Sequence, residues 1–313
     1  MDRILGKIEG EMPGPLIICL AGVHGNEQVG IHAFRNVYSA IRDHKIKFRG
    51  KLLGIVGNIK AIHENKRYID VDLNRVWSGD YITDLLTGER VPTYSEDFEL
   101  LDIYRTIERE SSGSYSLRVI ADLHSTSSDQ GNFVVVPEEV SNHAVIKALK
   151  LPVVVDIDKY LKGTLLSFYN NEGYISFAFE GGMIGTESVY QLHTSGLWEI
   201  LDKAGCITHH DHEAEDHYAN HLHGISRTLP EKVKVLHREP IQPGDGFRML
   251  PGFHNFMPVK KGQVLAVNHS GKIHAPVNGL IFMPLYQSEG SDGFFVVKPI
   301  GENDHVDALT LKS

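Results

Sequence analysis

The sequence predicts an α/β fold in which helices flank a mixed, largely parallel sheet, followed by a small all-β barrel or sandwich domain. Short apolar runs alternate with amphipathic segments up to about residue 205, which is typical of alternating strands and helices. From residue 232 onward, short strands are separated by glycine-bearing turns such as PGDG and APVNG. The 313 residues exceed what one compact core usually holds, so we expect two domains, 1–225 and 226–313.

The first unit of this pattern is a strand, a loop and a helix. The run LIICLA at residues 16–21 is short and continuously apolar, as in a strand that is buried on both faces of a parallel sheet. From residue 27 to about 42, apolar residues recur at spacings of three and four, which predicts an amphipathic helix. Asn26 is the expected cap of this helix.

The alternation continues along the chain. Apolar runs predict strands at 51–58, 117–125, 133–137, 151–157 and 174–182, and helical periodicity predicts helices at 98–110 and 188–205. Functional loops are expected at the carboxyl ends of the strands.

Composition excludes several classes of partner. The net charge is −9, with 31 basic and 40 acidic residues, so a general attraction to nucleic acid or anionic lipid is not expected. The amino terminus lacks the pattern of a secretory signal, and no apolar run approaches the ~18 residues of a membrane span, so a cytoplasmic protein is predicted. Only two cysteines occur, which directs the search for metal ligands to His, Asp and Glu.

Three candidate ligands end two predicted strands. In the stretch AGVHGNEQVG, His24 and Glu27 follow the first strand, and His124 ends the strand VIADLH. Ends of neighbouring central strands lie close together, and two imidazoles with one carboxylate are the ligands of several catalytic zinc sites. The alternative is a pair of polar turns, for which the Ser, Thr and Asp residues around His124 would be equally suited.

Two further segments carry side chains suited to catalysis. The segment KRYIDVDLNRVW, residues 66–77, brings Arg67, Asn74 and Arg75 together, and these donors suit a carboxylate or a developing oxyanion. A solvated loop with surface ion pairs is the alternative. Glu180 ends the apolar strand YISFAFE, where burial would raise its pKa and suit it to proton transfer, although a turn carboxylate would look the same.

Taken together, VHGNE, DLNR, the DLH strand end and the strand-end glutamate resemble the succinylglutamate desuccinylase/aspartoacylase family, a branch of the zinc carboxypeptidase-like fold. The motifs span about residues 15–182, and the glycine-turn region after residue 226 is similar to that family's C-terminal domain. The resemblance implies that His24, Glu27 and His124 bind one Zn²⁺ per chain and that Glu180 is the general base and acid.

The resemblance also implies roles for the 66–77 segment. Arg67 would polarise the scissile carbonyl and stabilise the oxyanion, while Asn74 and Arg75 would hold a substrate carboxylate. Zinc lowers the pKa of its water toward ~7, and Glu180 would accept the proton and return it to the leaving amine. Asp122, two residues before His124, is expected to share its face of the strand, either as support for the histidine or as a structural turn residue.

Two positions depart from the family pattern. Members that act on N-acetylaspartate carry an arginine shortly before the catalytic glutamate, where this chain has Asn170 and Asn171. Such members also use a tyrosine of the C-terminal domain, and its approximate counterpart is Phe294 or Phe295, with Tyr286 close by. The sequence therefore leaves the substrate open.

The histidine-rich stretch HHDHEAEDHYANHLHG, residues 209–224, is a competing metal site. On a helix, Glu213, His217 and His221 would stack at four-residue spacing and offer a ligand face. Because the stretch is very polar and lacks a strand-end scaffold, we interpret it as a solvated helix.

The predicted function is a zinc-dependent hydrolase that cleaves the amide bond of an N-acyl amino acid or a related small carboxylate. A zinc carboxypeptidase-like peptidase and a non-catalytic protein that binds a metal or a carboxylate are the alternatives. The expected partner is a small N-acylated molecule, with no nucleic acid or membrane; assembly into a homo-oligomer is left open.

Overall fold

The computed structural model describes residues 1–126, 131–207, 212–242, 244–287 and 290–301. Its strands are β1 (Ile4–Glu9), β2 (Met12–Ala21), β3 (Arg49–Val56), β4 (Arg118–Thr126), β5 (Phe133–Val135), β6 (Val153–Val155), β7 (Ile175–Met183), β8 (Lys232–Pro240), β9 (Arg248–Met249), β10 (Pro258–Val259), β11 (Val264–Asn268), β12 (Gly271–His274), β13 (Gly279–Phe282) and β14 (Asp292–Pro299). Within this part of the chain, one large sheet has the order β1-β3-β2-β4-β7-β5-β6-β8-β14-β13-β10, and a small sheet has the order β12-β11-β9.

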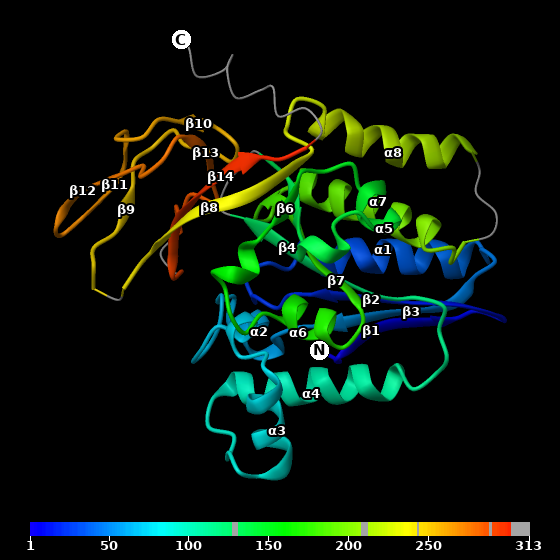
Figure 1. Ribbon diagram of the computed structural model, residues 1–313. Helices are drawn as coiled ribbons and strands as arrows, with labels where there is room; N and C mark the ends of the chain where they lie inside the picture. The colour runs from blue at the N-terminus through cyan, green and yellow to red at the C-terminus, as the bar shows by residue number, and fades with distance from the viewer. Residues whose placement is uncertain (127–130, 208–211, 243, 288–289, 302–313) are drawn as a thin grey trace.

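Helices lie on both faces of the large sheet (Figure 1). They are α1 (Val29–Asp43), α2 (Ile59–Glu64), α3 (Gly79–Thr87), α4 (Ser95–Glu110), α5 (Ala144–Ala148), α6 (Leu165–Asn171), α7 (Glu187–Lys203) and α8 (His212–Ser226). Short 3₁₀ helices cover Leu73–Arg75, Glu138–Val140 and Ile157–Lys159.

The centre of the sheet is parallel, as the sequence predicts. Strands β3, β2, β4 and β7 run side by side in one direction, while β1 and β5 are antiparallel to their neighbours β3 and β7. In this register His124 of β4 lies beside Glu180 of β7. Parallel strands end at the same edge, so the loops that follow β2, β4 and β7 meet there.

Strand β2 shows why the sheet is buried on both faces. Successive side chains of a strand point to opposite faces, and β2 carries apolar residues at every position from 16 to 21. Ile17 and Cys19 pack with α1, α5, α7 and α8, whereas Leu16, Ile18 and Leu20 pack with α3, α4 and α6. Two hydrophobic clusters thus enclose the sheet.

The start of α1 differs from the prediction. The helix begins at Val29 with Gln28 at its cap position and no capping bond from a side chain, so the assignment of Asn26 as the cap is wrong. The reason is a turn in which the Glu27 N–H donates to the His24 carbonyl at 3.0 Å, which keeps the loop residues out of the helix. The predicted helix itself is confirmed.

The C-terminal part, from β8 to β14, is all β, as expected, but its strands are shared between two sheets. β8 pairs in parallel with β6, and β14, β13 and β10 extend the large sheet beyond it. One hydrophobic cluster joins Phe133 and Val154 to Val233, Phe282 and Phe295 across this junction. The division into domains 1–225 and 226–313 stays a prediction, with α8 ending at Ser226.

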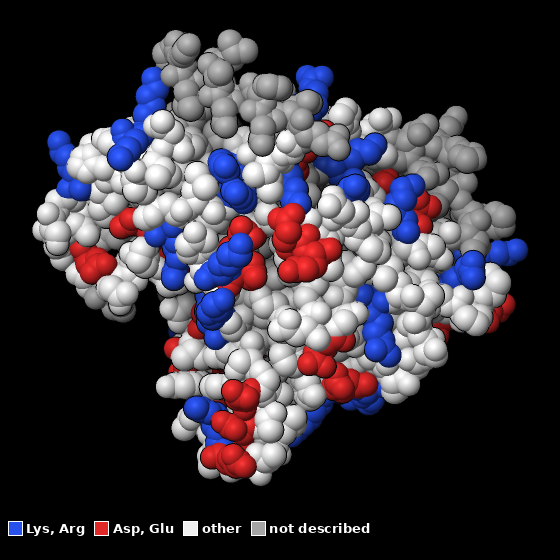
Figure 2. All heavy atoms as spheres, in the orientation of Figure 1, with Lys and Arg blue, Asp and Glu red and all other residues white. Residues whose placement is uncertain are grey.

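Surface properties fit the composition. On the face shown in Figure 2, basic and acidic side chains are interspersed, and the coloured residues form no continuous basic surface there. None of the helices that the structure describes is both long and apolar enough to cross a membrane.

Candidate metal centre and surrounding site

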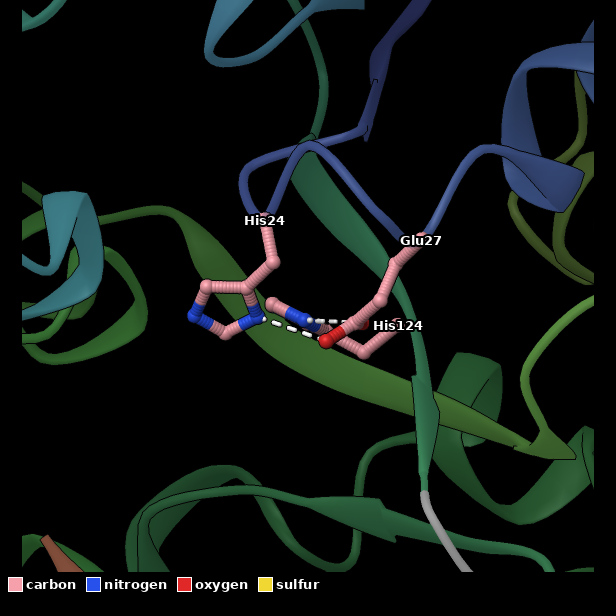
Figure 3. A group of neighbouring side chains, drawn as sticks. All are labelled: His24, Glu27 and His124. Carbon is pink, nitrogen blue, oxygen red and sulfur yellow. Dashed lines mark hydrogen bonds and ion pairs between the residues drawn. The ribbon is translucent and has the colours of Figure 1, made fainter. Parts of the chain in front are cut away.

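The three predicted metal ligands meet at the carboxyl edge of the sheet. His24 and Glu27 come from the loop after β2, and His124 from the end of β4; all three are buried. Figure 3 shows their side chains pointing toward one another, and one donor atom from each lies within 4.8 Å of the others. Among the side chains that the structure describes, this is the one such group of His, Cys, Asp and Glu donors.

Glycines allow the loop to place these ligands. Gly22 has a φ of +75°, in the left-handed region that favours glycine. A Cβ on Gly25 would lie 2.1 Å from the carbonyl carbon of Ala61, so a larger residue does not fit there. The short turn after β2 therefore brings both His24 and Glu27 to the sheet edge.

The Glu27 carboxylate lies between the two imidazoles. Its Oε1 is 2.8 Å from Nδ1 of His24, and its Oε2 is 3.1 Å from Nδ1 of His124. The backbone N–H of Ser125 also donates to Oε2 at 2.8 Å. The centroids of the two imidazole rings are 4.9 Å apart, and both Nδ1 atoms face the same small space around the Glu27 carboxylate.

Each histidine is supported from behind by an aspartate. Nε2 of His24 lies 3.2 Å from Asp72 Oδ1, and Nε2 of His124 lies 2.7 Å from Asp122 Oδ2. A carboxylate only accepts, so Nε2 of each ring donates and Nδ1 of a neutral ring keeps its lone pair. Asp122 therefore supports His124, which was one of its two predicted roles, and Asp72 is a partner that the sequence did not assign.

This arrangement fits a metal ion. A lone pair of Nδ1 and a carboxylate oxygen repel each other at 2.8 Å unless a cation lies between them. Without a metal, protons take that place: burial disfavours a charged His124, yet Asp122 and Glu27 raise its pKa well above the usual range. Burial likewise opposes ionisation of Glu27, but His24 and His124 lower its pKa well below the usual range. Two imidazoles and a carboxylate are a typical donor set for zinc.

Glu180 lies beside this group. It is on β7, next to His124 in the register, and it lines the same cavity. Burial raises the pKa of Glu180 to about 7, with His124 opposing the shift and Glu27 adding to it. Its Oε2 has no hydrogen-bond partner among the described residues. The carboxyl group is thus able both to accept and to donate a proton near neutral pH.

Arg67 reaches the metal centre from the 66–77 loop. Its guanidinium donates to Glu27 Oε1 and to Asp72 Oδ2, each at 3.3 Å. Its carbonyl oxygen accepts from the N–H of Gly25 at 3.1 Å, which ties the 66–77 loop to the loop after β2. A half-buried guanidinium is therefore held close to the candidate ligands.

Asn74 and Arg75 follow in the 3₁₀ helix Leu73–Arg75. Asp72 begins this helix, since its carboxylate accepts from the backbone N–H of Asn74 at 2.9 Å. The Asn74 side chain accepts from the N–H of Leu165 at 2.9 Å, and Arg75 lies 3.5 Å from Asp292 at the start of β14. Both side chains line the cavity.

The structure brings all the predicted site residues together. One cavity is lined by the predicted ligands, the predicted proton carrier and the predicted donors, namely His24, Glu27, Arg67, Asn74, Arg75, His124 and Glu180.

Glu96 at the start of α4 is a supporting residue that the sequence did not reveal. It is fully buried, and its carboxylate accepts from the backbone N–H groups of Ile69, Asp70 and Val71 and from the Asn58 side chain. The only sequence signal was an acidic residue in the first turn of a helix, which is common without such a role.

The positions that depart from the family pattern do not line the cavity. Asn170 bonds the backbone of Leu166 and Ser176, and Asn171 is exposed. Phe294 and Phe295 are core residues. The Tyr286 hydroxyl donates to the carbonyl of Leu250 and accepts from the N–H of Phe253.

From residue 212 onward the histidine-rich stretch forms helix α8, as predicted, but one face of the helix is packed. Tyr218 stacks on Trp198 of α7, Leu222 is buried, and Nδ1 of His221 lies 2.8 Å from the Ser195 hydroxyl. His217 is exposed, whereas the Glu213 side chain is outside the described residues. The described contacts of His221 are those of a helix that packs on α7.

The fold and this cavity define a mixed α/β protein with a candidate metal centre at the carboxyl edge of its sheet. The chain belongs to the succinylglutamate desuccinylase/aspartoacylase family. The model of the "Succinylglutamate desuccinylase/Aspartoacylase catalytic domain" matches residues 13–192, which is more than half of the chain. The resemblance inferred from the sequence motifs is thereby confirmed.

Curated relatives agree with this assignment. A succinylglutamate desuccinylase of Photorhabdus laumondii is 29% identical over 141 residues, which are 44% of this chain and 42% of that protein. An N-acyl-aromatic-L-amino acid amidohydrolase (carboxylate-forming) B of Danio rerio is 30% identical over 122 residues, 38% of this chain and 36% of that protein. The matched regions thus span about two fifths of these relatives' length.

A solved structure extends the likeness to the whole fold. The crystal structure of a succinylglutamate desuccinylase/aspartoacylase from Rhodobacter sphaeroides has a TM-score of 0.66 at 16% sequence identity. The superposition covers 95% of this chain and 88% of that chain, so the C-terminal strands are included.

Proposed function

We propose that this protein is a zinc-dependent hydrolase that cleaves the amide bond of an N-acyl amino acid or a related small carboxylate. The observation that carries the proposal is the placement of His24, Glu27 and His124 beside Glu180 in one buried cavity. Family membership supports it, because the names of the relatives describe a desuccinylase and an amidohydrolase.

One Zn²⁺ per chain would be held by His24, Glu27 and His124. When bound, the ion supplies Lewis acidity and lowers the pKa of a water ligand. Asp72 and Asp122 orient the two imidazoles by accepting from their Nε2 atoms.

The protein's own groups account for the remaining chemistry. Glu180 accepts a proton from the attacking water and then donates it to the leaving amine, a dual role that suits a carboxyl with a pKa of about 7. Arg67 stabilises the negative charge that develops on the carbonyl oxygen. Asn74 and Arg75 bind the substrate carboxylate, for which a guanidinium is well suited.

Small substrates are favoured over peptides. Residues of the C-terminal part, Met283, Gln287 and Ser291 among them, line the same cavity and close it from one side. A carboxypeptidase-like enzyme would need an open path for the amino-terminal side of its peptide, so this alternative is the weaker of the two.

The test is metal analysis coupled to hydrolysis of N-acetyl, N-succinyl and peptide substrates. Glu180→Gln should retain zinc and lose about 10²–10⁴-fold in kcat, whereas the exposed Glu172→Gln should change neither. His24→Ala and His124→Ala should lose the metal. Zinc retained with no turnover by the parent protein on any substrate would support the binding-protein alternative instead.

A further inference from the structure

The cavity has an apolar wall that the proposed chemistry does not use. The wall consists of Val135, Ile157, Leu161, Leu166, Ala178 and Met283. It draws on β5, β7, α6 and the segments around residues 157–161 and 283, so elements far apart in the sequence build it together. Such a wall is suited to an apolar ligand group, since burial of apolar surface is its main contribution.

The wall is part of the hydrophobic core, and its side chains are packed. Ile157, Leu161 and Leu166 retain only 4%, 9% and 5% of their accessible surface, and they belong to the same hydrophobic cluster as Phe282 and Phe295. These side chains are therefore already packed in place. Little conformational entropy of the wall is lost when a ligand covers them.

One end of the wall adjoins the proposed carboxylate site. The N–H of Leu165 donates to the Asn74 side chain at 2.9 Å. Gly163 packs so closely on Arg75 that a Cβ there would lie 2.2 Å from the Arg75 carbonyl oxygen. The segment that carries Leu161 and Leu166 is thus fixed beside Asn74 and Arg75.

The other end adjoins the reacting groups. Ala178 lies two residues before Glu180 on β7 and therefore faces the same side of the sheet, and Val135 is its partner on β5. The wall consequently spans the distance between the proposed carboxylate site and Glu180.

The structure of an N-acyl α-amino acid fits this arrangement of carboxylate site, apolar wall and Glu180. One carbon atom carries the carboxylate, the amide nitrogen and the side chain. If Arg75 holds the carboxylate and Glu180 faces the amide, the carbon that joins these two groups lies between Arg75 and Glu180. The side chain branches from this carbon, and the wall that connects the two sites is the apolar surface of the cavity that can receive it.

The charges around the cavity disfavour an acidic side chain. Among the described lining residues, the Lys and Arg side chains are Arg67 and Arg75, which the metal centre and the first carboxylate use. Asp158 and Asp292 add negative charge to the lining. A second carboxylate would meet apolar groups and aspartates, which is costly.

From this placement we propose that the substrates are N-acyl α-amino acids with an uncharged, apolar side chain that packs on the wall of Ile157, Leu161 and Leu166. The inference rests on the proposed function and specifies the amino acid that this site releases.

Equilibrium binding tests it without turnover. Zinc-loaded Glu180→Gln protein is titrated calorimetrically with N-acetylnorleucine, Nα-acetyllysine, N-acetylaspartate and N-succinylglutamate. N-acetylnorleucine should bind at least about 10-fold more tightly than each charged ligand. Tighter binding of N-acetylaspartate or N-succinylglutamate would overturn the inference, as would tighter binding of Nα-acetyllysine, which would make Asp158 a cation site.

Variants locate the effect on the wall. Leu161→Asn should weaken binding of N-acetylnorleucine about 10-fold and leave binding of N-acetylglycine within about twofold, because glycine has no side chain to pack. Leu86→Asn, at an exposed position of α3, is the matched control. Leu161→Ala serves if the polar variant is unstable, and it should act in the same direction. An equal loss for both ligands would contradict the proposal.

Hydrolysis by the parent protein separates the two proposals. Faster cleavage of N-acetylaspartate than of N-acetylnorleucine would overturn the substrate class and leave the hydrolase intact. Selective binding of N-acetylnorleucine without cleavage of any substrate would overturn the hydrolase and leave the ligand class intact.

Discussion

Asp122 shows how a single residue behind the proposed metal ligands should set the affinity for zinc. It accepts from His124 Nε2 at 2.7 Å and is itself buried. We expect Asp122→Asn to weaken zinc binding about 10–100-fold, because the amide lacks the charge that orients and polarises the imidazole. Competition with a chelator measures the change. Asp80→Asn, at an exposed position, is the control and should bind zinc like the parent. An unchanged affinity in Asp122→Asn would mean that its carboxylate is only structural.

His193 provides a prediction about stability and pH. The side chain is fully buried, and its Nε2 donates to the Phe179 carbonyl at 3.2 Å. Burial lowers the pKa of His193 to about 4, whereas an unfolded histidine titrates near 6.5. Its contribution to stability is therefore complete above pH 6.5 and is lost progressively as the pH falls toward 4. Between pH 7 and pH 5 the loss should be about 2 kcal/mol.

Urea unfolding of the protein and of His193→Gln at both pH values isolates this effect. Glutamine does not titrate, so the parent should lose about 2 kcal/mol more than the variant on acidification. The same change in both proteins would assign the pH dependence to other groups.

The site residues at strand ends could be predicted from the sequence. The residues that hold them in place by hydrogen bonds could not. His24, Glu27, His124 and Glu180 each follow or end an apolar run, so the parallel sheet alone brings them to one edge. Asp72 supports His24 across 48 positions of the sequence, through a loop whose path no local pattern reveals.

At the scale of elements, the start of α4 holds the 66–77 loop in place. Glu96 accepts three backbone N–H groups of that loop, and glutamine would turn an N–H₂ group toward some of these donors. Glu96→Gln should therefore lower the free energy of unfolding by about 2–4 kcal/mol. It should also reduce kcat/KM through displacement of Arg67 and Arg75.

The exposed Glu108→Gln on the same helix is the control and should alter neither quantity. Denaturant unfolding and steady-state kinetics measure the two effects. A stable Glu96→Gln protein with normal kinetics would show that the loop keeps its position without this carboxylate.

Long periodic elements could be predicted from the sequence, whereas short ones could not. α1 and α7 show helical spacing over 15 and 17 residues. α2 and α6 have six and seven residues, too few turns for a periodic pattern to emerge. β1 is an edge strand with half-exposed residues, so it lacks the continuous apolar run that identifies β2.

At the scale of the whole molecule, the shared sheet and core predict a single unfolding unit. β6 pairs with β8, and the cluster around Phe133 and Phe282 joins both parts of the chain. We expect calorimetry to detect one cooperative transition whose calorimetric and van't Hoff enthalpies agree. Two transitions, or a fragment 226–313 that folds alone, would instead support separate domains.

The change from alternating strands and helices to a β-rich segment near residue 226 could be predicted. The pairing of that segment with the large sheet could not. Glycine turns identify the β-rich part from composition alone. The pairing of Val154 with Val233 joins residues 79 positions apart, and such a register depends on packing that periodicity does not encode.

The division of labour within the cavity has an evolutionary consequence. The proposed metal ligands and Glu180 lie on β4, on β7 or in the loop directly after β2, whereas Leu161 and Met283 of the apolar wall lie in connecting segments. Mutations of Leu161 or Met283 would alter what the cavity accepts and leave the ligand geometry untouched. Proteins that descend from such a scaffold can change the substrates they accept while they keep one reaction. A protein engineer who wants to change the substrate would begin with the same connecting segments.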